Sequence, residues 1–128
     1  MKIYGVGTDI VKISRIKSLI KKKTIKSRLF SSKEILKCKN IKNSHNCYAK
    51  RFAAKEAFSK ALGIGLRMNL NFKDIEVVND KMGKPYYVKN KKITKIIHKK
   101  FKIKNYKCFL SISDEKNYST AFAINQTS

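Results

Sequence analysis

Cysteine is scarce in this sequence: the 128 residues include only three, and no two of them form a CxxC pair. An odd number of cysteines argues against a disulfide framework and is typical of a reducing cytosol. Cys38, His45 and Cys47 are close enough in sequence to suggest zinc, but no fourth ligand stands at a usual spacing. The cysteines therefore support neither a disulfide scaffold nor a zinc centre.

Long apolar runs, low-complexity linkers and internal repeats are also missing, and the chain has a single proline. No stretch approaches the roughly 20 apolar residues that a transmembrane helix needs. The N-terminal residues lack the apolar core of a signal peptide. Hydrophobic residues still make up 42% of the chain, enough for one folded core. We expect one soluble, cytoplasmic domain spanning residues 1–128, with no membrane partner.

Acidic residues are few: 8 Asp and Glu stand against 31 Lys and Arg, for a net charge of +23. Such a surface attracts polyanions, whether nucleic acids, acidic membranes or acidic proteins. Arginine is itself rare, with 4 residues against 27 lysines. Nucleic-acid binders usually rely on Arg for bidentate contacts. The many lysines also have a second explanation, because an A/T-rich genome favours the codons of Lys, Ile and Asn. Nucleic-acid binding by a small basic protein is therefore kept as an alternative function and is not the favoured one.

The remaining pattern favours an α+β fold in which helices and strands are partly segregated. Ser14 and Ser31 are candidate helix N-caps, and Ser31 with Glu34 has capping-box form. Gly63 should end the longest helix, and the turn at residues 80–85 should join two strands. The expected strands are 2–12, 74–79, 86–89, 108–113 and 119–124. The expected helices are 15–23, 47–62 and 93–101. A further helix, expected after Ser31, includes residues 35–36.

The helix expected over residues 47–62 carries the most informative pattern. At about 100° per residue, its alanines fill one broad arc that faces the core. Phe52, Glu56 and Lys60 fall on the opposite arc. Glu56 and Lys60 suit a surface ion pair at i, i+4 spacing, but an aromatic ring on a polar arc needs a partner. A ligand or another subunit could be that partner for Phe52, so this arc is a candidate functional site.

Gly5 and Gly7 precede Asp9 in the first expected strand. The GxG pattern is weak by itself, and no GxGxxG follows a strand into a helix, so a dinucleotide-binding fold is not indicated. One interpretation is a β-bulge with a turn-forming Asp. The other is a carboxylate on a closely packed backbone that forms a hard-cation site with Glu56. Mg²⁺ binds one or two carboxylates together with water and substrate phosphates, so it is the expected metal.

Two segments stand out by their order and spacing. The first is Val6-Gly7-Thr8-Asp9-Ile10-Val11 followed by Arg15. The second runs from Arg51 to Ala61 as Arg-Phe-Ala-Ala-Lys-Glu-Ala-Phe-Ser-Lys-Ala. Together they resemble the holo-[acyl-carrier-protein] synthases, the short, trimeric class of 4'-phosphopantetheinyl transferase. The similarity continues through residues 63–65, 74–77, 79–80, 83–85, 111–113 and 118, so it spans nearly the whole chain.

The resemblance implies a transferase that moves the 4'-phosphopantetheine arm of coenzyme A onto a serine of apo acyl carrier protein. The reaction releases adenosine 3',5'-bisphosphate and supports fatty acid biosynthesis. The implied fold is an antiparallel sheet wrapped around one long helix. The implied assembly is a homotrimer with shared active sites, in which Phe109 and Phe122 of the closing strands are candidate packing groups.

The site residues implied by the resemblance follow by motif match. Asp9 and Glu56 would hold Mg²⁺, and Lys60 would stabilise phosphate charge or help proton transfer, so these are the expected catalytic residues. The expected coenzyme A contacts are Arg51, Phe52, Lys60, Gly63, Lys84 and Pro85. Many family members carry His after the Ser-x-Ser strand, where this chain has Asp114. The general base therefore stays open between a metal-bound water and Glu56.

The helix expected after Ser14 is strongly basic and follows directly on Asp9. Acyl carrier proteins are acidic, so this helix is the candidate docking surface. Arg15 matches an arginine of the family here, whereas the lysines also suit a solvated basic face. The expected docking residues are Arg15, Lys17, Lys21 and Lys22.

Overall fold

The computed structural model describes residues 1–65 and 68–128. Its central element is α4 (Ser44–Leu62), the longest helix. Ala53 and Ala57, two of the alanines expected to face the core, are fully buried. Gly63 ends α4 in the left-handed conformation with φ 70°, which matches the sequence-based expectation.

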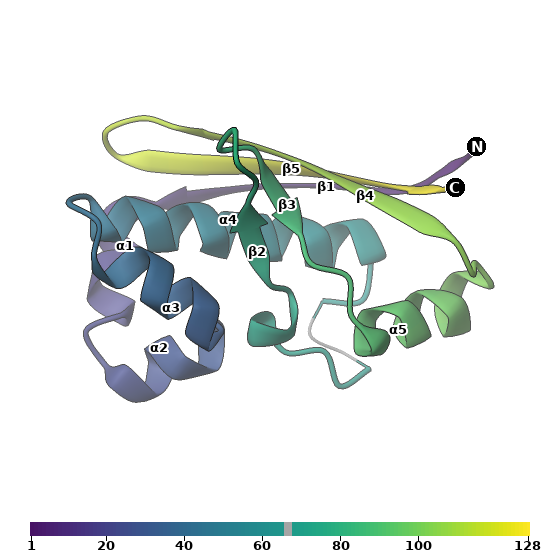
Figure 1. Cartoon of the computed structure of the whole chain (residues 1–128), viewed down its shortest axis with the longest axis horizontal. Coiled ribbons are helices and arrows are strands. Elements are labelled where there is room, and N and C mark those ends of the chain that lie inside the picture. Colours follow the sequence, from purple (N-terminus) through teal and green to yellow (C-terminus); the bar gives the residue numbers. More distant parts are fainter. Residues whose placement is uncertain (66–67) are drawn as a thin grey trace.

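A three-stranded antiparallel sheet lies along one side of α4 (Figure 1). Its order is β1 (Ile3–Lys12), β5 (Tyr118–Thr127) and β4 (Tyr106–Asp114). The two strands expected at 108–113 and 119–124 pair with each other as β4 and β5, and β5 pairs with β1 as well. Small residues face α4 from neighbouring strands, since Gly7 lies opposite Ala123. The two chain ends lie together at one end of the sheet (Figure 1).

The predicted hairpin lies in front of α4 in Figure 1. It consists of β2 (Val77–Asn79) and β3 (Pro85–Tyr87). The strand expected from residue 74 begins later, because η1 (Phe72–Asp74) is a single 3-10 turn with its own capping box. The Tyr87 hydroxyl donates to the carbonyl oxygen of Ala54 at 2.6 Å and so ties the hairpin to α4. The fold is α+β, as predicted, with the strands in two sheets.

Within the described residues, four shorter α-helices accompany α4: α1 (Ile13–Leu19), α2 (Lys23–Leu29), α3 (Ser32–Lys39) and α5 (Lys91–Phe101). Ser14 is not the N-cap of α1, because the helix begins one residue earlier. The amide of Ile13 donates to the carbonyl oxygen of Asn117 at 2.9 Å, a partner distant in sequence. Helix α2 was not predicted, and it buries no residue fully. The capping box of Ser31 and Glu34 is present at the start of α3.

Cys38 and Cys47 form a disulfide between the end of α3 and the first turns of α4. The inference drawn from the odd cysteine count is therefore wrong for this pair, and both sulfurs are unavailable to zinc. The count failed because it carries no spatial information: the fold places the two Cα atoms 5.5 Å apart, a normal disulfide separation. Cys108 is free.

Candidate active site

Two glycines allow β1 to lie directly against α4. A Cβ on Gly7 would lie 1.9 Å from the carbonyl oxygen of Ala57, and one on Gly5 would lie 2.0 Å from that of Ala61. A side chain at either position would push the strand off the helix. Asp9 follows two residues after Gly7 on the same face of the strand, so it too faces α4. A carboxylate on a closely packed backbone is one of the two interpretations that the sequence allowed.

Asp9 meets Lys60 where β1 crosses α4. Lys60 Nζ lies 3.1 Å from Asp9 Oδ1 and donates to the carbonyl oxygen of Thr8 at 3.0 Å. The Asp9 side chain is 15% exposed and that of Lys60 is 54% exposed, so the ammonium reaches the carboxylate from the solvent side. Among the described residues, the ion pair of Lys60 is thus with the strand, and not with Glu56 one helical turn away as the spacing suggested.

Glu56 lies partly buried beside this pair. Burial raises the pKa of the Glu56 carboxyl, the negative charge of Asp9 raises it further, and Lys60 and Arg15 oppose the shift. The two carboxylates therefore repel each other. Carboxylate oxygens are ligands for hard divalent cations. The described residues hold no cluster of three or more His, Cys, Asp or Glu suited to a metal, so a cation at this crossing would take its other ligands from water or substrate.

Phe52 and Gly63, both expected among the coenzyme A contacts, also have structural roles within the chain. Phe52 is 7% exposed and packs edge-on against Phe72, with ring centroids 5.4 Å apart. Within the chain, the ring therefore packs against η1 instead of lying exposed on a polar arc. Helical periodicity placed Phe52 on a polar arc because it does not show which distant segment covers that arc. Gly63 is the C-cap of α4.

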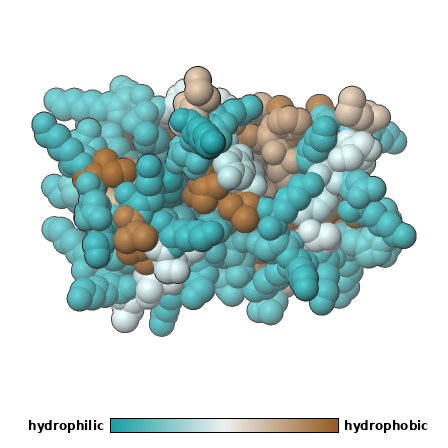
Figure 2. Space-filling view, in the orientation of Figure 1, coloured by the Kyte–Doolittle hydropathy of each residue, from teal (hydrophilic) through white to brown (hydrophobic). Residues whose placement is uncertain are grey.

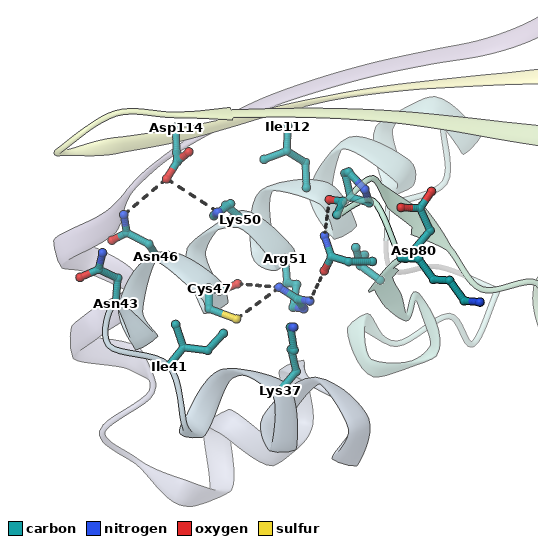
Figure 3. Close-up of a pocket in the computed structure, with 15 residues that line it drawn as sticks. Lys37, Ile41, Asn43, Asn46, Cys47, Lys50, Arg51, Asp80, Ile112 and Asp114 are labelled. Atoms are coloured by element: carbon teal, nitrogen blue, oxygen red, sulfur yellow. Dashed lines mark hydrogen bonds and ion pairs between the residues drawn. The ribbon is translucent and has the colours of Figure 1, made fainter.

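A hollow of about 640 Å³ lies between α3, the start of α4, the β2–β3 turn and the end of β4 (Figure 3). Arg51 lines it with a side chain that is almost fully buried. The guanidinium donates through one nitrogen to the Cys47 carbonyl oxygen at 3.4 Å and through another to Asn79 Oδ1 at 2.8 Å. Burial lowers the pKa of Arg51, yet a guanidinium stays charged in proteins. The hollow therefore contains a fixed positive charge.

Lysines surround the same hollow. Lys37 of α3, Lys50 of α4 and Lys81 of the hairpin turn all line it. Asp114 lies at the end of β4, 4.0 Å from Lys50, and accepts a hydrogen bond from Asn46 at 3.4 Å (Figure 3). The excess of positive charge suits an anionic ligand such as a nucleotide. Sequence reasoning missed these lysines because nothing in the pattern separates them from the other lysines of the chain.

The structure divides the expected site residues between two places. Arg51 and Pro85 line the hollow, and Lys84 lies between the lining residues Gly83 and Pro85 without lining it. The carboxylate pair with Lys60 lies instead at the β1–α4 crossing. On one chain, the described lining of the hollow does not include Asp9, Glu56 or Lys60.

All the expected docking residues are exposed. Arg15 and Lys17 lie on α1, whereas Lys21 and Lys22 lie in the turn before α2. Arg15 is close enough to the carboxylate pair for its charge to lower the pKa of Glu56. Helix α1 therefore lies beside the carboxylate pair.

The outer face of the sheet is more apolar than the face of the molecule shown in Figure 2, which is mostly hydrophilic. On it, Val6 and Ile10 of β1 are 54% and 64% exposed, and Phe109 and Phe122 are each 44% exposed. Large exposed apolar patches usually mark interaction surfaces.

None of the helices in the described part of the chain is both long and apolar enough to cross a membrane.

Comparison with known proteins gives a consistent result. The family model of the 4'-phosphopantetheinyl transferase superfamily matches residues 5–123. The holo-[acyl-carrier-protein] synthase of Pelagibacter ubique is 58% identical over 126 residues, which cover 98% of each chain. That of Fusobacterium nucleatum is 41% identical over 122 residues, 95% of this chain and 98% of the relative.

Solved structures agree with this assignment. The holo-[acyl-carrier-protein] synthase of Neisseria meningitidis has a TM-score of 0.87 at 36% identity, with 98% of this chain and all of that chain covered. The Bacillus anthracis enzyme, solved in complex with CoA (3',5'-ADP), has a TM-score of 0.81 at 32% identity, with 98% of each chain covered. None of these relatives supports the nucleic-acid-binding alternative. The chain therefore belongs to the 4'-phosphopantetheinyl transferase superfamily and, within it, to the holo-[acyl-carrier-protein] synthases.

Proposed function

We propose that the chain transfers the 4'-phosphopantetheine group of coenzyme A to a serine of apo acyl carrier protein, in support of fatty acid biosynthesis. The serine oxygen attacks the phosphorus that bears the pantetheine arm, and the bond from that phosphorus to the bridging oxygen breaks. Adenosine 3',5'-bisphosphate leaves, and the serine proton passes to a base. The observation that carries the proposal is the meeting of Asp9, Glu56 and Lys60 where β1 crosses α4.

Asp9 and Glu56 would hold Mg²⁺ in this reaction. Their donor set fits the ion, because two carboxylates that repel each other gain from a divalent cation between them. When bound, Mg²⁺ would neutralise charge on the pyrophosphate. Lys60, 3.1 Å from Asp9, would place a further positive charge beside the transferred phosphate. Phosphoryl transfer depends mainly on such positioning and charge stabilisation.

The cationic hollow would bind the nucleotide end of coenzyme A. Arg51, Lys37 and Lys50 supply positive charge to it, as the phosphates of the nucleotide require. Its volume of about 640 Å³ falls in the usual range of ligand pockets, about 300–1,000 Å³. The CoA complex of the Bacillus anthracis relative supports the same substrate.

We further propose that a homotrimer completes the active site. The hollow and the carboxylate pair occupy separate places on one chain, so a neighbouring copy would bring the two together around one substrate. The exposed outer face of the sheet offers the contact surface, with Phe109 and Phe122 at its centre. Sedimentation should show a trimer at working concentration, and Phe122→Lys should yield smaller, poorly active species. An active wild-type monomer would refute the shared site.

Apo acyl carrier protein would dock on α1 and the following turn, through Arg15, Lys17, Lys21 and Lys22. This surface lies beside the carboxylate pair, where the acceptor serine must reach the phosphate. Acidic carrier proteins and a chain of charge +23 attract each other at long range. We place the reaction in the cytoplasm.

Mass spectrometry of the carrier protein tests the proposed function directly. Incubation of apo acyl carrier protein with coenzyme A, Mg²⁺ and the enzyme should add about 340 Da, the mass of phosphopantetheine less water. A carrier protein whose acceptor serine is replaced by alanine is the matched control and should gain nothing. An unmodified wild-type carrier protein after prolonged incubation would contradict the proposal.

A further inference from the structure

Lys55 is a buried cation that the reaction described above does not use. Its side chain is 0% exposed. Its ammonium donates to Glu34 Oε1 at 2.7 Å, to the Phe72 carbonyl oxygen at 2.8 Å and to the Ile75 carbonyl oxygen at 2.7 Å. Three acceptors match the three N–H groups of an ammonium. The arrangement resists distortion, because each lost bond would leave a buried polar group unsatisfied.

Glu34 extends this constraint to two more segments. It is 1% exposed, and its two carboxylate oxygens accept from the amide of Ser31 at 2.9 Å and from that of Val77 at 3.0 Å. The Ser31 hydroxyl in turn lies 2.5 Å from a carboxylate oxygen of Glu76. The Lys55–Glu34 pair therefore joins α4, the start of α3 and the entry to β2 through bonds of defined direction.

The entry to β2 leads into the wall of the cationic hollow. Asn79, two residues after Val77, accepts from the Arg51 guanidinium at 2.8 Å and donates to the Gly83 carbonyl oxygen at 3.0 Å. Arg51 lies one helical turn before Lys55 on α4. The helix that carries Arg51 thus also holds, through Lys55, the hairpin that carries Asn79.

We propose that Lys55 and Glu34 are positioning residues for coenzyme A, which set the distance between Arg51 and the β2–β3 hairpin. The proposal rests on the proposed function, in which the hollow binds the nucleotide end of coenzyme A. Apolar residues of similar size often stabilise a core as well as a buried ion pair does. They supply no directional bonds, however, and directional bonds are what fixes the wall of this hollow relative to α4.

The test replaces both charges at once, by K55M with E34M, so that neither charge stays buried alone. Titration calorimetry with coenzyme A should show a Kd raised about tenfold, a typical coupling for residues in one network. The KM for acyl carrier protein should stay within about twofold of wild type, because α1 is not part of the network. The K55M with E34Q variant keeps the test open if the first double variant does not fold, because it also leaves no charge buried alone. An amide has one oxygen and one nitrogen, so it cannot accept from both the Ser31 and the Val77 amides as the Glu34 carboxylate does.

A second ion pair of the chain provides the matched control. Lys92 and Asp74 lie 2.6 Å apart and join α5 to η1, and neither residue lines the hollow. The K92M with D74N variant should therefore bind coenzyme A as wild type does, even if its melting temperature falls. This control separates loss of an ion pair in general from loss of the pair that holds the hairpin.

Coupling to Arg51 distinguishes a positioning role from a purely structural one. R51A should weaken coenzyme A binding, and addition of K55M with E34M should weaken it little further, because all three residues act through one contact. Wild-type Kd in a folded K55M/E34M protein, or full additivity with R51A, would overturn the proposal. If wild-type protein neither binds coenzyme A nor modifies the carrier protein, the proposed function fails first and this inference with it.

Discussion

Replacement of Gly7 by alanine should damage stability and activity together, because it separates β1 from α4. The new Cβ would lie 1.9 Å from the carbonyl oxygen of Ala57 and 2.7 Å from the amide nitrogen of Ala61. Both are backbone atoms that cannot rotate away. Ordinary van der Waals contact begins at 3.4 Å, so the strand would have to retreat by the difference, 1.5 Å.

That retreat has a cost in both stability and rate. Overpacking of a core costs about 1–3 kcal/mol, and a clash with two backbone atoms belongs near the upper value, about 3 kcal/mol. The same displacement carries Asp9 away from Glu56 and Lys60. A misplacement of about 1 Å in a catalytic group can lower the rate about 100-fold. We therefore expect Gly7→Ala to lose roughly 3 kcal/mol of unfolding free energy and at least about 100-fold in kcat.

Urea unfolding and carrier-protein modification measure the two effects on the same preparation. Thr8→Ser is the matched control, because Thr8 alternates to the opposite face of β1. It lies beside Phe122 on the outer face, and this change removes only one methyl group there. The variant should keep most of the stability and turnover of the wild-type protein. A Gly7→Ala protein with wild-type unfolding free energy would refute the close-packing argument.

Three further predictions concern the carboxylate pair, the disulfide and the docking surface. Glu56→Gln should lower turnover about 100-fold yet raise the melting temperature of the metal-free protein at pH 7. Burial and Asp9 raise the pKa of Glu56 above its ordinary 4.5, so the folded state loses stability as the pH rises through that raised pKa. The uncharged amide of glutamine avoids this loss at pH 7. A lower melting temperature for Glu56→Gln would contradict the argument. Cys38 and Cys47 are 9 residues apart, and reduction of their disulfide should lower the free energy of unfolding by about 2.5 kcal/mol. Urea titrations with and without a dithiol measure the difference, and identical unfolding curves would disprove this contribution. Arg15→Glu should raise the KM for acyl carrier protein several-fold at low salt, less so at high salt, and leave the KM for coenzyme A unchanged. An unaffected carrier-protein KM at both salt concentrations would remove α1 from the docking surface.

Local chemistry in the sequence determined several elements of the fold. The reciprocal bonds of Ser31 and Glu34 begin α3, Gly63 ends α4 in a conformation that other residues resist, and residues 80–84 turn the hairpin. Each of these signals involves residues within a few positions of one another. Their outcome therefore depends little on how the rest of the chain folds.

The sequence also singled out Asp9, Glu56 and Lys60 as one site, through residue type and through the family resemblance. It did not reveal how they pair. Helical spacing favoured Glu56 with Lys60, whereas the strand brings Asp9 closer to the ammonium. Spacing describes neighbours on one helix and contains no information about a strand packed on top of it.

The tertiary structure alone decided which residues became structural. Phe52 was expected on a polar arc and lies buried against Phe72. Cys38 and Cys47 were expected as thiols and form a disulfide. Lys55 was one lysine among 27 in the sequence and is fully buried with three acceptors. In each case the partner comes from a segment outside the local pattern. Burial and pairing are properties of contacts between distant segments, and those contacts exist only once the chain has folded.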